Sequence, residues 1–463
     1  AAVLRRPVSG LSPFAPNCEG VAQTGTPFVN SEVEPYLAVN PIDPGNLVGV
    51  WQQDRWSNGS ARGQGVGVSV DGGESWSTGA MAYSRCGGGN AGNGGDYYRA
   101  TDPWVSFGPT GIAHQMSLTT RGGSFQAGSA NAMVASRSLD GGVTWSNAIA
   151  LILDGSTHFN DKNALTADPY DPNYVYAVWD RLAASGGGPA IFARSVNAGA
   201  SWQPVQTIYD PGASSQTIGN VIAVLPDGRL LDLFTQIDPT PGGDSRALVR
   251  VMRSSDRGQT WGAPVTVAQL LSRGASDPEN GTPIRDGSIL AQFAVAPDGA
   301  VHVVWQDSRF SGGARDGIAW SVSRDGGDTW TPARQVNRAP GVQAFMPGVY
   351  VLADGTLGIA YYDLRSNTAA PSLLTDYWLV RTRDGEHWVE DRLSGPFDLG
   401  FAPNANGLFV GDYQGLVGTG ADFLSLHVIA NASTTNRSDA WFARIRPADV
   451  PAAPLPPMPV QAK

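Results

Sequence analysis

The chain has 463 residues, a net charge of −10 and only 16% charged residues, with no basic tract, which argues against nucleic acid or an anionic membrane surface as a partner. No apolar run approaches the length of a membrane-spanning helix. The 58 Gly, 33 Pro and 14 Trp residues suit many short strands joined by tight turns, because helix interiors exclude Gly and Pro.

The first segment, residues 1–30, is expected to be an arm that precedes the repeated part of the chain. It opens with Ala-Ala-Val, a start that fits the removal of a secretion signal at a small-residue site. The two cysteines, Cys18 and Cys86, lie in Gly- and Pro-rich loop sequence. In an exported protein they are expected to form a disulfide that pins the arm to the first sheet. The prediction is therefore a secreted, extracellular protein.

An eight-residue pattern, S-x-D-x-G-x-[ST]-W, then recurs along the chain. In such a segment Asp and Ser or Thr bond the local backbone, Gly takes a positive φ and Trp packs back under the sheet, so each copy predicts a β-hairpin turn. The copies are at 69–76, 138–145, 195–202, 254–261 and 323–330, with a sixth, one residue shorter, at 382–388.

A pair of apolar strands precedes each of these turns, and a P-x-x-P or P-D-G turn joins several of the pairs. Examples are Tyr36–Val39 with Leu47–Trp51 and Phe293–Val295 with Val301–Trp305. With the strands on either side of the repeated turn, each unit contains four strands and recurs about every 55–70 residues, as the blades of a propeller do.

A seventh pair of inner strands lies within 408–428 and has no repeated turn. We therefore predict an all-β fold, a seven-bladed β-propeller of four-stranded antiparallel blades over residues 31–446. The last blade would be completed by Trp441–Ile445 and by a strand from the N-terminal arm, since closing the ring removes exposed sheet edges. Six blades with an accessory hairpin is the alternative. Residues 447–463 are a tail rich in Pro and Ala.

With six such turns, the chain resembles the sialidase superfamily of Asp-box (BNR-repeat) propellers over nearly its whole length. The superfamily includes sialidases, uronate-cleaving lyases, xyloglucan hydrolases and propellers that only bind, so the resemblance implies the fold more strongly than the chemistry. Sialidases hold their acid sugar with three arginines and use an Asp acid/base and a Tyr nucleophile activated by Glu. The Phe/Tyr-Arg-Ile-Pro segment that opens the sialidase propeller is missing, and Glu34-Pro35-Tyr36 stands in its place.

In a propeller of this kind the start of each innermost strand faces the upper end of the channel, away from the repeated turns. Carboxyl groups, a His and a Tyr around one axis are suitable parts for acid/base chemistry. The candidate catalytic residues are Glu34, Asp102, His158, Asp161, Tyr362 and Tyr413. Glu34-Pro35 and Asp102-Pro103 occupy the same register, which fits a repeated framework role equally well.

Five arginines follow the second strand of five different blades. A planar guanidinium group matches a carboxylate with two parallel hydrogen bonds, so a ring of such groups predicts an acidic ligand. These residues are Arg55, Arg121, Arg181, Arg309 and Arg365. The alternative is that each Asp–Arg pair steadies its own loop.

These features predict a secreted carbohydrate-active enzyme that recognises a carboxylate-bearing sugar, first of all a sialidase-like exo-glycoside hydrolase. A polysaccharide lyase that cleaves beside a uronate by β-elimination is the alternative, with His158 as the base. A non-catalytic glycan-binding propeller is the third candidate. No cofactor is required, no segment spells a metal site, and a structural Ca²⁺ among the Asp-bearing loops is left open. The expected partner is an acidic oligosaccharide or polysaccharide, and the protein is expected to be a monomer.

Overall fold

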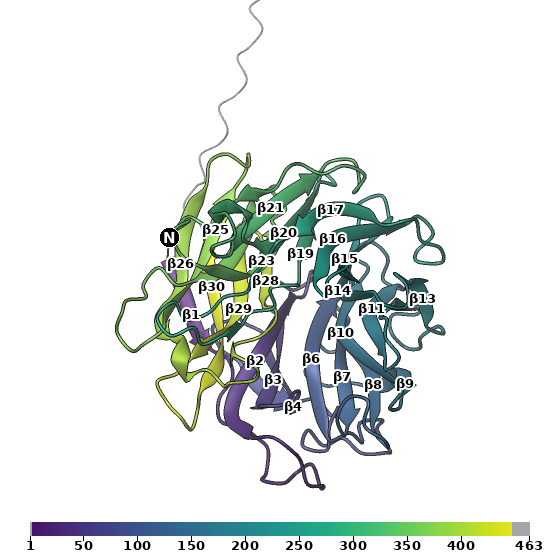
Figure 1. The fold of residues 1–463 in the computed structure, drawn as a ribbon. Coiled ribbons are helices and arrows are strands. Elements are labelled where there is room, and N and C mark those ends of the chain that lie inside the picture. Colours follow the sequence, from purple (N-terminus) through teal and green to yellow (C-terminus); the bar gives the residue numbers. More distant parts are fainter. Residues whose placement is uncertain (1, 447–463) are drawn as a thin grey trace, which may run out of the picture.

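The computed structural model describes residues 2–446, so the predicted tail at 447–463 lies outside the described residues. The regular secondary structure of the described chain is β-strand apart from two short 3-10 helices, η1 (Arg309–Ser311) and η2 (Leu399–Phe401) (Figure 1). No helix in this part of the chain is long and apolar enough to cross a membrane.

All strands except β18 (Ile284–Arg285) and β27 (Leu408–Phe409) belong to seven antiparallel groups of four. The first three groups are β2 (Pro27–Val39), β3 (Leu47–Trp56), β4 (Ala61–Ser69), β5 (Ser77–Ala80); β6 (Arg99–Phe107), β7 (Ala113–Arg121), β8 (Ala130–Ser138), β9 (Ile149–Asp154); and β10 (His158–Ala167), β11 (Val175–Ala183), β12 (Ala190–Ser195), β13 (Gln206–Tyr209). The next three are β14 (Gln216–Val224), β15 (Leu230–Pro239), β16 (Ser245–Ser254), β17 (Val265–Leu270); β19 (Gln292–Val295), β20 (Val301–Asp307), β21 (Gly317–Ser323), β22 (Arg334–Gln335); and β23 (Ala344–Val351), β24 (Leu357–Asp363), β25 (Leu374–Thr382), β26 (Val389–Asp398). The seventh consists of β28 (Gly415–Thr419), β29 (Asp422–Ala430), β30 (Ser438–Arg446) and β1 (Ala2–Pro7).

The groups follow one another around a ring. The first strand of each group contacts the first strand of the next, in the order β2, β6, β10, β14, β19, β23 and β28, and β28 contacts β2 again. Single residue pairs, Ser31 with Ser438 and Ala61 with Ala100, extend the hydrogen bonding between neighbouring groups. The strand from the N-terminal arm, β1, pairs with β30, which comes from the far end of the described chain (Figure 1).

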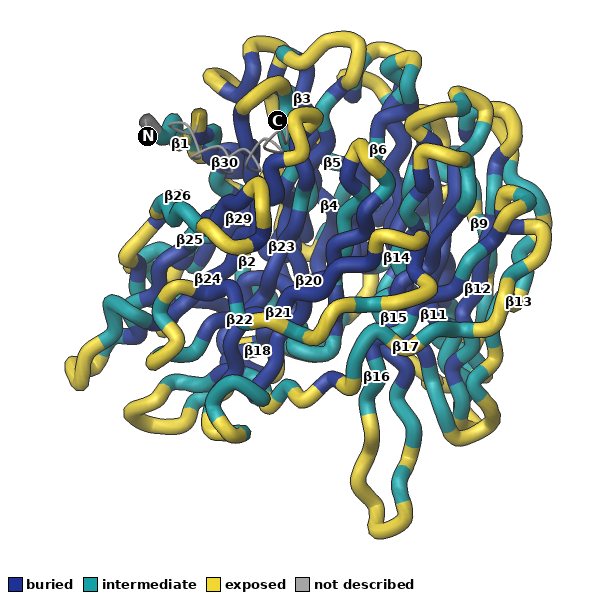
Figure 2. The backbone as a smooth tube through the Cα atoms, turned by 90° about the horizontal axis from the view of Figure 1, so that it is seen from above, coloured by how far each residue is buried: buried dark blue, intermediate teal, exposed yellow. Residues whose placement is uncertain are grey.

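The apolar core lies between neighbouring groups and is not concentrated in one place. Met116 of β7, Phe192 of β12 and Leu230 of β15 are all buried in one cluster that spans three consecutive groups. Strands in the interior are buried along most of their length, and the exposed residues gather in the connecting loops (Figure 2). Each group therefore buries its apolar faces only by packing against its neighbours.

The repeated turns join the third and fourth strands of the first six groups, as the pattern predicts. In the copy at 138–145, Thr144 donates from its backbone N and its Oγ1 to Asp140, at 2.9 and 2.6 Å. Gly142 N donates to Ser138 Oγ at 2.8 Å, and the Trp145 indole donates to the Gly142 carbonyl. The bonds to Asp, or to Asn197 in the third copy, recur in the other turns. The turns are thus fixed by short-range hydrogen bonds.

The N-terminal arm crosses from β1 to β2 and is held by a disulfide between Cys18 and Cys86, with Cα atoms 4.8 Å apart. The predicted pairing of the two cysteines is confirmed. Because Cys86 lies between β5 and β6, the disulfide fixes the arm to the loop between the first and second groups.

Candidate functional site

A repeated distortion of the innermost strands creates the site. In five groups the first strand shifts its pairing register, and a residue with positive φ stands at the shift. These residues are Glu34 (φ 52°), Asp102 (53°), Lys162 (48°), Gly219 (67°) and Met346 (54°). A positive φ is costly for residues other than glycine, so its recurrence with charged side chains suggests a functional constraint.

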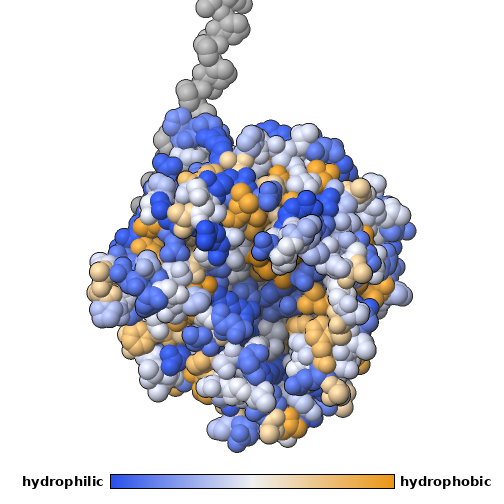
Figure 3. All heavy atoms as spheres, in the orientation of Figure 1, coloured by the Kyte–Doolittle hydropathy of each residue, from blue (hydrophilic) through white to orange (hydrophobic). Residues whose placement is uncertain are grey.

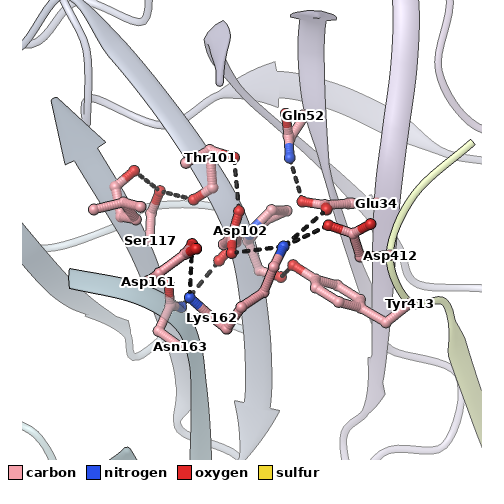
Figure 4. A network of polar contacts seen from close by, with 12 residues as sticks. Glu34, Gln52, Thr101, Asp102, Ser117, Asp161, Lys162, Asn163, Asp412 and Tyr413 are labelled. Atoms are coloured by element: carbon pink, nitrogen blue, oxygen red, sulfur yellow. Dashed lines mark hydrogen bonds and ion pairs between the residues drawn. The ribbon is translucent and has the colours of Figure 1, made fainter. Parts of the chain in front are cut away.

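Four charged side chains meet at this level from separate segments of the chain, and we call them the central ion cluster: Glu34, Asp102, Lys162 and Asp412 (Figure 4). The first three lie on first strands, and Asp412 precedes β28. Lys162 Nζ lies 2.5 Å from Asp412 Oδ2, 3.4 Å from Asp102 Oδ2 and 3.5 Å from Glu34 Oε1. All four side chains are at most 10% exposed. One ammonium group thus lies within ion-pair distance of carboxyl groups from three parts of the chain.

Arg285 extends the cluster from the short strand β18. Its Nε and Nη2 donate to the two oxygens of Asp412, at 3.2 and 2.8 Å. Its guanidinium carbon lies 4.3 Å from the centre of the Phe409 ring, and that of Arg55 lies 4.8 Å from the same centre. Arg55 Nη1 donates to Gln52 Oε1 at 2.7 Å, and Gln52 in turn donates to Glu34.

Burial and charge push the carboxyl groups of the site toward different protonation states. Burial raises the pKa of Glu34 to about 8, against the opposing charge of Lys162. Burial alone would also raise the pKa of Asp412, but the charges of Lys162 and Arg285 hold it well below its usual value. Burial raises the pKa of Asp161 to about 6, again against Lys162. Burial therefore favours the protonated form of Glu34, whereas the two neighbouring cations favour the ionised form of Asp412.

A pocket of about 330 Å³ opens beside the cluster, and we call it the central pocket. Its charged lining residues are Arg55, Arg99, Asp102, Asp161, Lys162 and Arg285. Lys162 and Arg285 are already paired with Asp412, so Arg55 and Arg99 are the cations of this lining that could hold an anionic ligand. No residue of the repeated turns lines this pocket. The space-filling view shows a hollow near the centre of one face where hydrophilic residues gather (Figure 3).

Two of the four cations lack an acidic partner. Within the described part of the chain, the hydrogen bonds of Arg55 and Arg99 go to neutral acceptors, and neither residue forms an ion pair. Burial, with the nearby charge of Arg285, lowers the pKa of Arg55 to about 10, and burial lowers that of Arg99 to about 10. A buried cation without a counter-charge is unfavourable, so an anion in the pocket would stabilise both.

The five arginines predicted to form one ring do not converge. Of the five only Arg55 lines the central pocket. The other four pair with carboxylates: Arg121 with Asp96, Arg181 with Asp154, Arg309 with Asp307, and Arg365 with Asp363 and Glu390. Arg309 and Arg365 thus pair within their own loops, as the alternative expected, whereas Arg121 and Arg181 bind carboxylates from other segments of the chain.

The predicted catalytic residues separate into two sets. Asp102 and Asp161 line the central pocket, and Glu34 lies directly behind it in the cluster. The hydroxyl groups of the two tyrosines are already engaged: Tyr362 donates to the Val428 carbonyl at 2.8 Å, and Tyr413 donates to the Pro103 carbonyl at 2.9 Å. His158 bonds Thr157 and does not line the pocket. Both tyrosines are buried. The assignment of Tyr362, Tyr413 and His158 as catalytic groups therefore finds no support in the geometry.

The sequence analysis missed Arg99, Lys162, Arg285 and Asp412 as site residues. Lys162 carried one signal, since it is one of only two lysines in the chain and the other is Lys463. Arg285 carried none, because it lies in an irregular segment that has no apolar strand pattern.

Comparisons with known proteins identify no family. No protein-family model matches the chain, and no curated protein matches it in sequence. Among solved structures, the Hadza microbial sialidase Hz136 aligns with a TM-score of 0.49 and 16% identity, over 87% of this chain and 73% of that one. The Penicillium chrysogenum α-L-arabinanase complexed with arabinobiose aligns with a TM-score of 0.48 and 12% identity, over 94% and 98% of the two chains. A Dyadobacter fermentans protein of unknown function gives 0.48 and 14%, over 90% and 95%.

Proposed function

We propose that this chain is a seven-bladed β-propeller glycoside hydrolase that removes a carboxylate-bearing sugar from the end of a glycan. The observation that carries the proposal is the pair of buried arginines, Arg55 and Arg99, on the wall of a pocket that also holds Asp102 and Asp161. Within the described residues the two arginines form no ion pair, and the two acidic residues supply the carboxyl pair that glycoside hydrolysis uses. The ring of seven four-stranded groups supports the propeller.

In this proposal Asp161 is the general acid. Its pKa, raised by burial to about 6, keeps part of the population protonated at mildly acidic pH, and the protonated form donates to the departing glycosidic oxygen. Asp161 is half-buried, whereas Asp102 is almost fully buried, so Asp161 is the more accessible of the two to a substrate.

Asp102 is the opposing carboxylate, which stabilises the positive charge that develops on the sugar or attacks its anomeric carbon. Thr101 Oγ1 donates to Asp102 Oδ1 at 2.7 Å, and Lys162 lies 3.4 Å from Oδ2, so the position and the charge of this side chain are both fixed. Glu34 does not line the pocket and acts through Lys162 and Asp412, as a positioning residue.

The lyase alternative has less support, because His158 does not line the pocket and the hydroxyl of Tyr413 is engaged with a backbone carbonyl. A protein that binds acidic glycans without cleaving them would need the arginines but not the carboxyl pair. Substitution of Asp161 separates hydrolysis from binding alone.

The test is hydrolysis of fluorogenic aryl glycosides of N-acetylneuraminate, of glucuronate and of neutral arabinofuranose. We expect release from an acidic glycoside, no measurable release by Asp161→Asn, and unchanged release by Asp298→Asn, in which the exposed Asp298 side chain serves as the matched control. Binding of the acidic sugars without hydrolysis would reduce the proposal to a glycan-binding protein. Hydrolysis of neutral and acidic glycosides at equal rates would refute recognition of the carboxylate, and an unsaturated uronate product would establish the lyase.

A further inference from the structure

One side of the central pocket is formed by a segment that belongs to none of the four-stranded groups. Residues 19–26, which we call the strap, run from the disulfide to the start of β2. Ala22, Gln23 and Thr24 of the strap line the central pocket. The blades alone would leave the pocket open on this side.

Apolar burial contributes little to holding the strap in place, since Ala22 is exposed and Val21 is 39% exposed. Its first end is fixed by the Cys18–Cys86 disulfide and by a buried ion pair, in which Glu19 Oε1 lies 3.0 Å from Arg62 Nε. Its last end is fixed by Thr26 and Ser57, which exchange two hydrogen bonds of 2.9 Å. The conformation of the strap therefore depends on a few polar and covalent attachments.

Arg99 connects the middle of the strap to the pocket. Its Nε donates to Gln23 Oε1 at 2.9 Å and its Nη2 to the Thr24 carbonyl at 2.7 Å, while Nη1 donates to the loop after β3 at Asn58 and Gly59. Its guanidinium group stacks over Trp56, with 4.4 Å between the guanidinium carbon and the ring centre. The same arginine lines the pocket, so an anion bound there would also favour the closed strap.

We propose that the strap is the size-selecting wall of the pocket: held shut by Arg99 and by the disulfide, it admits a sugar only at the end of a glycan chain. The inference rests on the proposed function and deepens it, because it assigns selectivity for chain ends to a segment outside the blades. An internal sugar has a further residue on its outer side, and the strap occupies that space. A variant with a released strap will accept internal sugars and will bind a terminal sugar more weakly.

The test uses the full chain, with the double variant Cys18→Ala/Cys86→Ala and the variant Gln23→Gly, and Leu11→Ala as the control, because Leu11 lies on the same arm and its side chain is 77% exposed. Hydrogen exchange measured by mass spectrometry reports the strap directly. We expect faster exchange in residues 19–26 in the double variant and, through loss of the Gln23–Arg99 hydrogen bond, in Gln23→Gly, at times too short for the strands to exchange. Leu11→Ala should change nothing.

Binding is measured by calorimetry with free N-acetylneuraminate and glucuronate, and with oligosialic acid and heparosan as polymers. One molecule of the unmodified protein should bind per polymer chain, whereas several molecules of the double variant should bind along one chain. The double variant should also bind the monosaccharide at least about tenfold more weakly, because contacts in the closed site are lost. For an aryl glycoside that the protein cleaves, KM should rise by the same factor while kcat changes by less than about twofold.

The outcomes distinguish this inference from the proposed function. If the unmodified protein binds neither acid sugar, the proposed function fails and the strap inference fails with it. If it binds the monosaccharide, but the double variant exchanges faster at 19–26 without any change in stoichiometry or affinity, only the strap inference is overturned. Binding of several unmodified molecules along one polymer would also overturn it.

Discussion

Lys162→Met tests the central ion cluster most directly. Lys162 lies within 3.5 Å of three carboxyl groups and is only 10% exposed, so the substitution keeps most of the side-chain volume and removes the shared positive charge. Asp412 keeps Arg285 as a partner, whereas Glu34 and Asp102 lose their nearest cation. Removing one partner of a buried ion pair costs about 3–5 kcal/mol of the free energy of unfolding, because the remaining charge is left uncompensated.

The loss should depend on pH in a defined direction. The pKa of Glu34 in the folded protein, raised by burial to about 8, is above its ordinary value of 4.5, so the stability that its proton contributes is fully present below about pH 4.5 and is lost as pH rises toward about 8. Lys162 opposes that rise in pKa, and without it the folded state holds the proton still more tightly. The penalty of Lys162→Met should therefore be larger at pH 8 than at pH 5.

Urea unfolding at pH 5 and pH 8 measures both effects, with circular dichroism to confirm that the variant is folded. Arg324→Met is the control, because Arg324 is 71% exposed and lies 3.6 Å from Asp298, and loss of an exposed pair costs less than about 1 kcal/mol at either pH. A loss below about 1 kcal/mol for Lys162→Met at pH 8, or a larger loss at pH 5, would refute the assignment of Lys162 as the buried counter-ion.

Three further predictions concern the pocket and the arm. Arg55→Ala should lower kcat/KM toward an acidic aryl glycoside about ten- to a hundredfold, equivalent to about 1.5–3 kcal/mol. Arg181→Ala should leave kcat/KM unchanged, because the Arg181 guanidinium group does not reach the pocket. Equal losses in the two variants would contradict the assignment of the site. The value of kcat/KM should fall as pH rises above about 6, since burial raises the pKa of Asp161 to about 6 and only the protonated form donates; a value that increases between pH 6 and 8 would exclude Asp161 as the acid. Removing the Cys18–Cys86 disulfide, which closes a sequence separation of 68 residues, should lower the free energy of unfolding by about 4 kcal/mol in the chain-entropy model, and an unchanged urea midpoint for the double alanine variant would argue against this.

The parts of the structure that the sequence predicted are those fixed by short-range chemistry. Each repeated turn closes on itself through bonds such as Thr144 to Asp140, so its conformation depends on eight consecutive residues. The alternation of apolar strands with turns predicted the strand pairs, because the two strands of a pair are also close together in the sequence. The sequence also placed Glu34 and Asp102 in the same register, each before a Pro, and both residues have a positive φ in the structure.

The arginine partners could not be predicted because they depend on tertiary contacts. Arg181 follows the second strand of its own group, but the carboxylate that binds it, Asp154, ends the fourth strand of the preceding group. Arg285 reaches the site from an irregular segment, through a two-residue strand that pairs with β27 far along the chain. No local pattern distinguishes an arginine that faces a pocket from one that faces a neighbouring loop.

The pairing of β1 with β30 covers a sheet edge that could otherwise pair with another molecule. Ala2 lies opposite Arg446 and Pro7 opposite Trp441, so one edge of β30 is covered by β1 from Trp441 to Arg446. If residues 2–7 were removed, that edge would present unpaired backbone groups, which readily pair with a strand from another molecule. Domain exchange follows the same geometry, since the β1 strand of one copy fits the β30 edge of a second. An intact N-terminal strand is thus also a protection against aggregation.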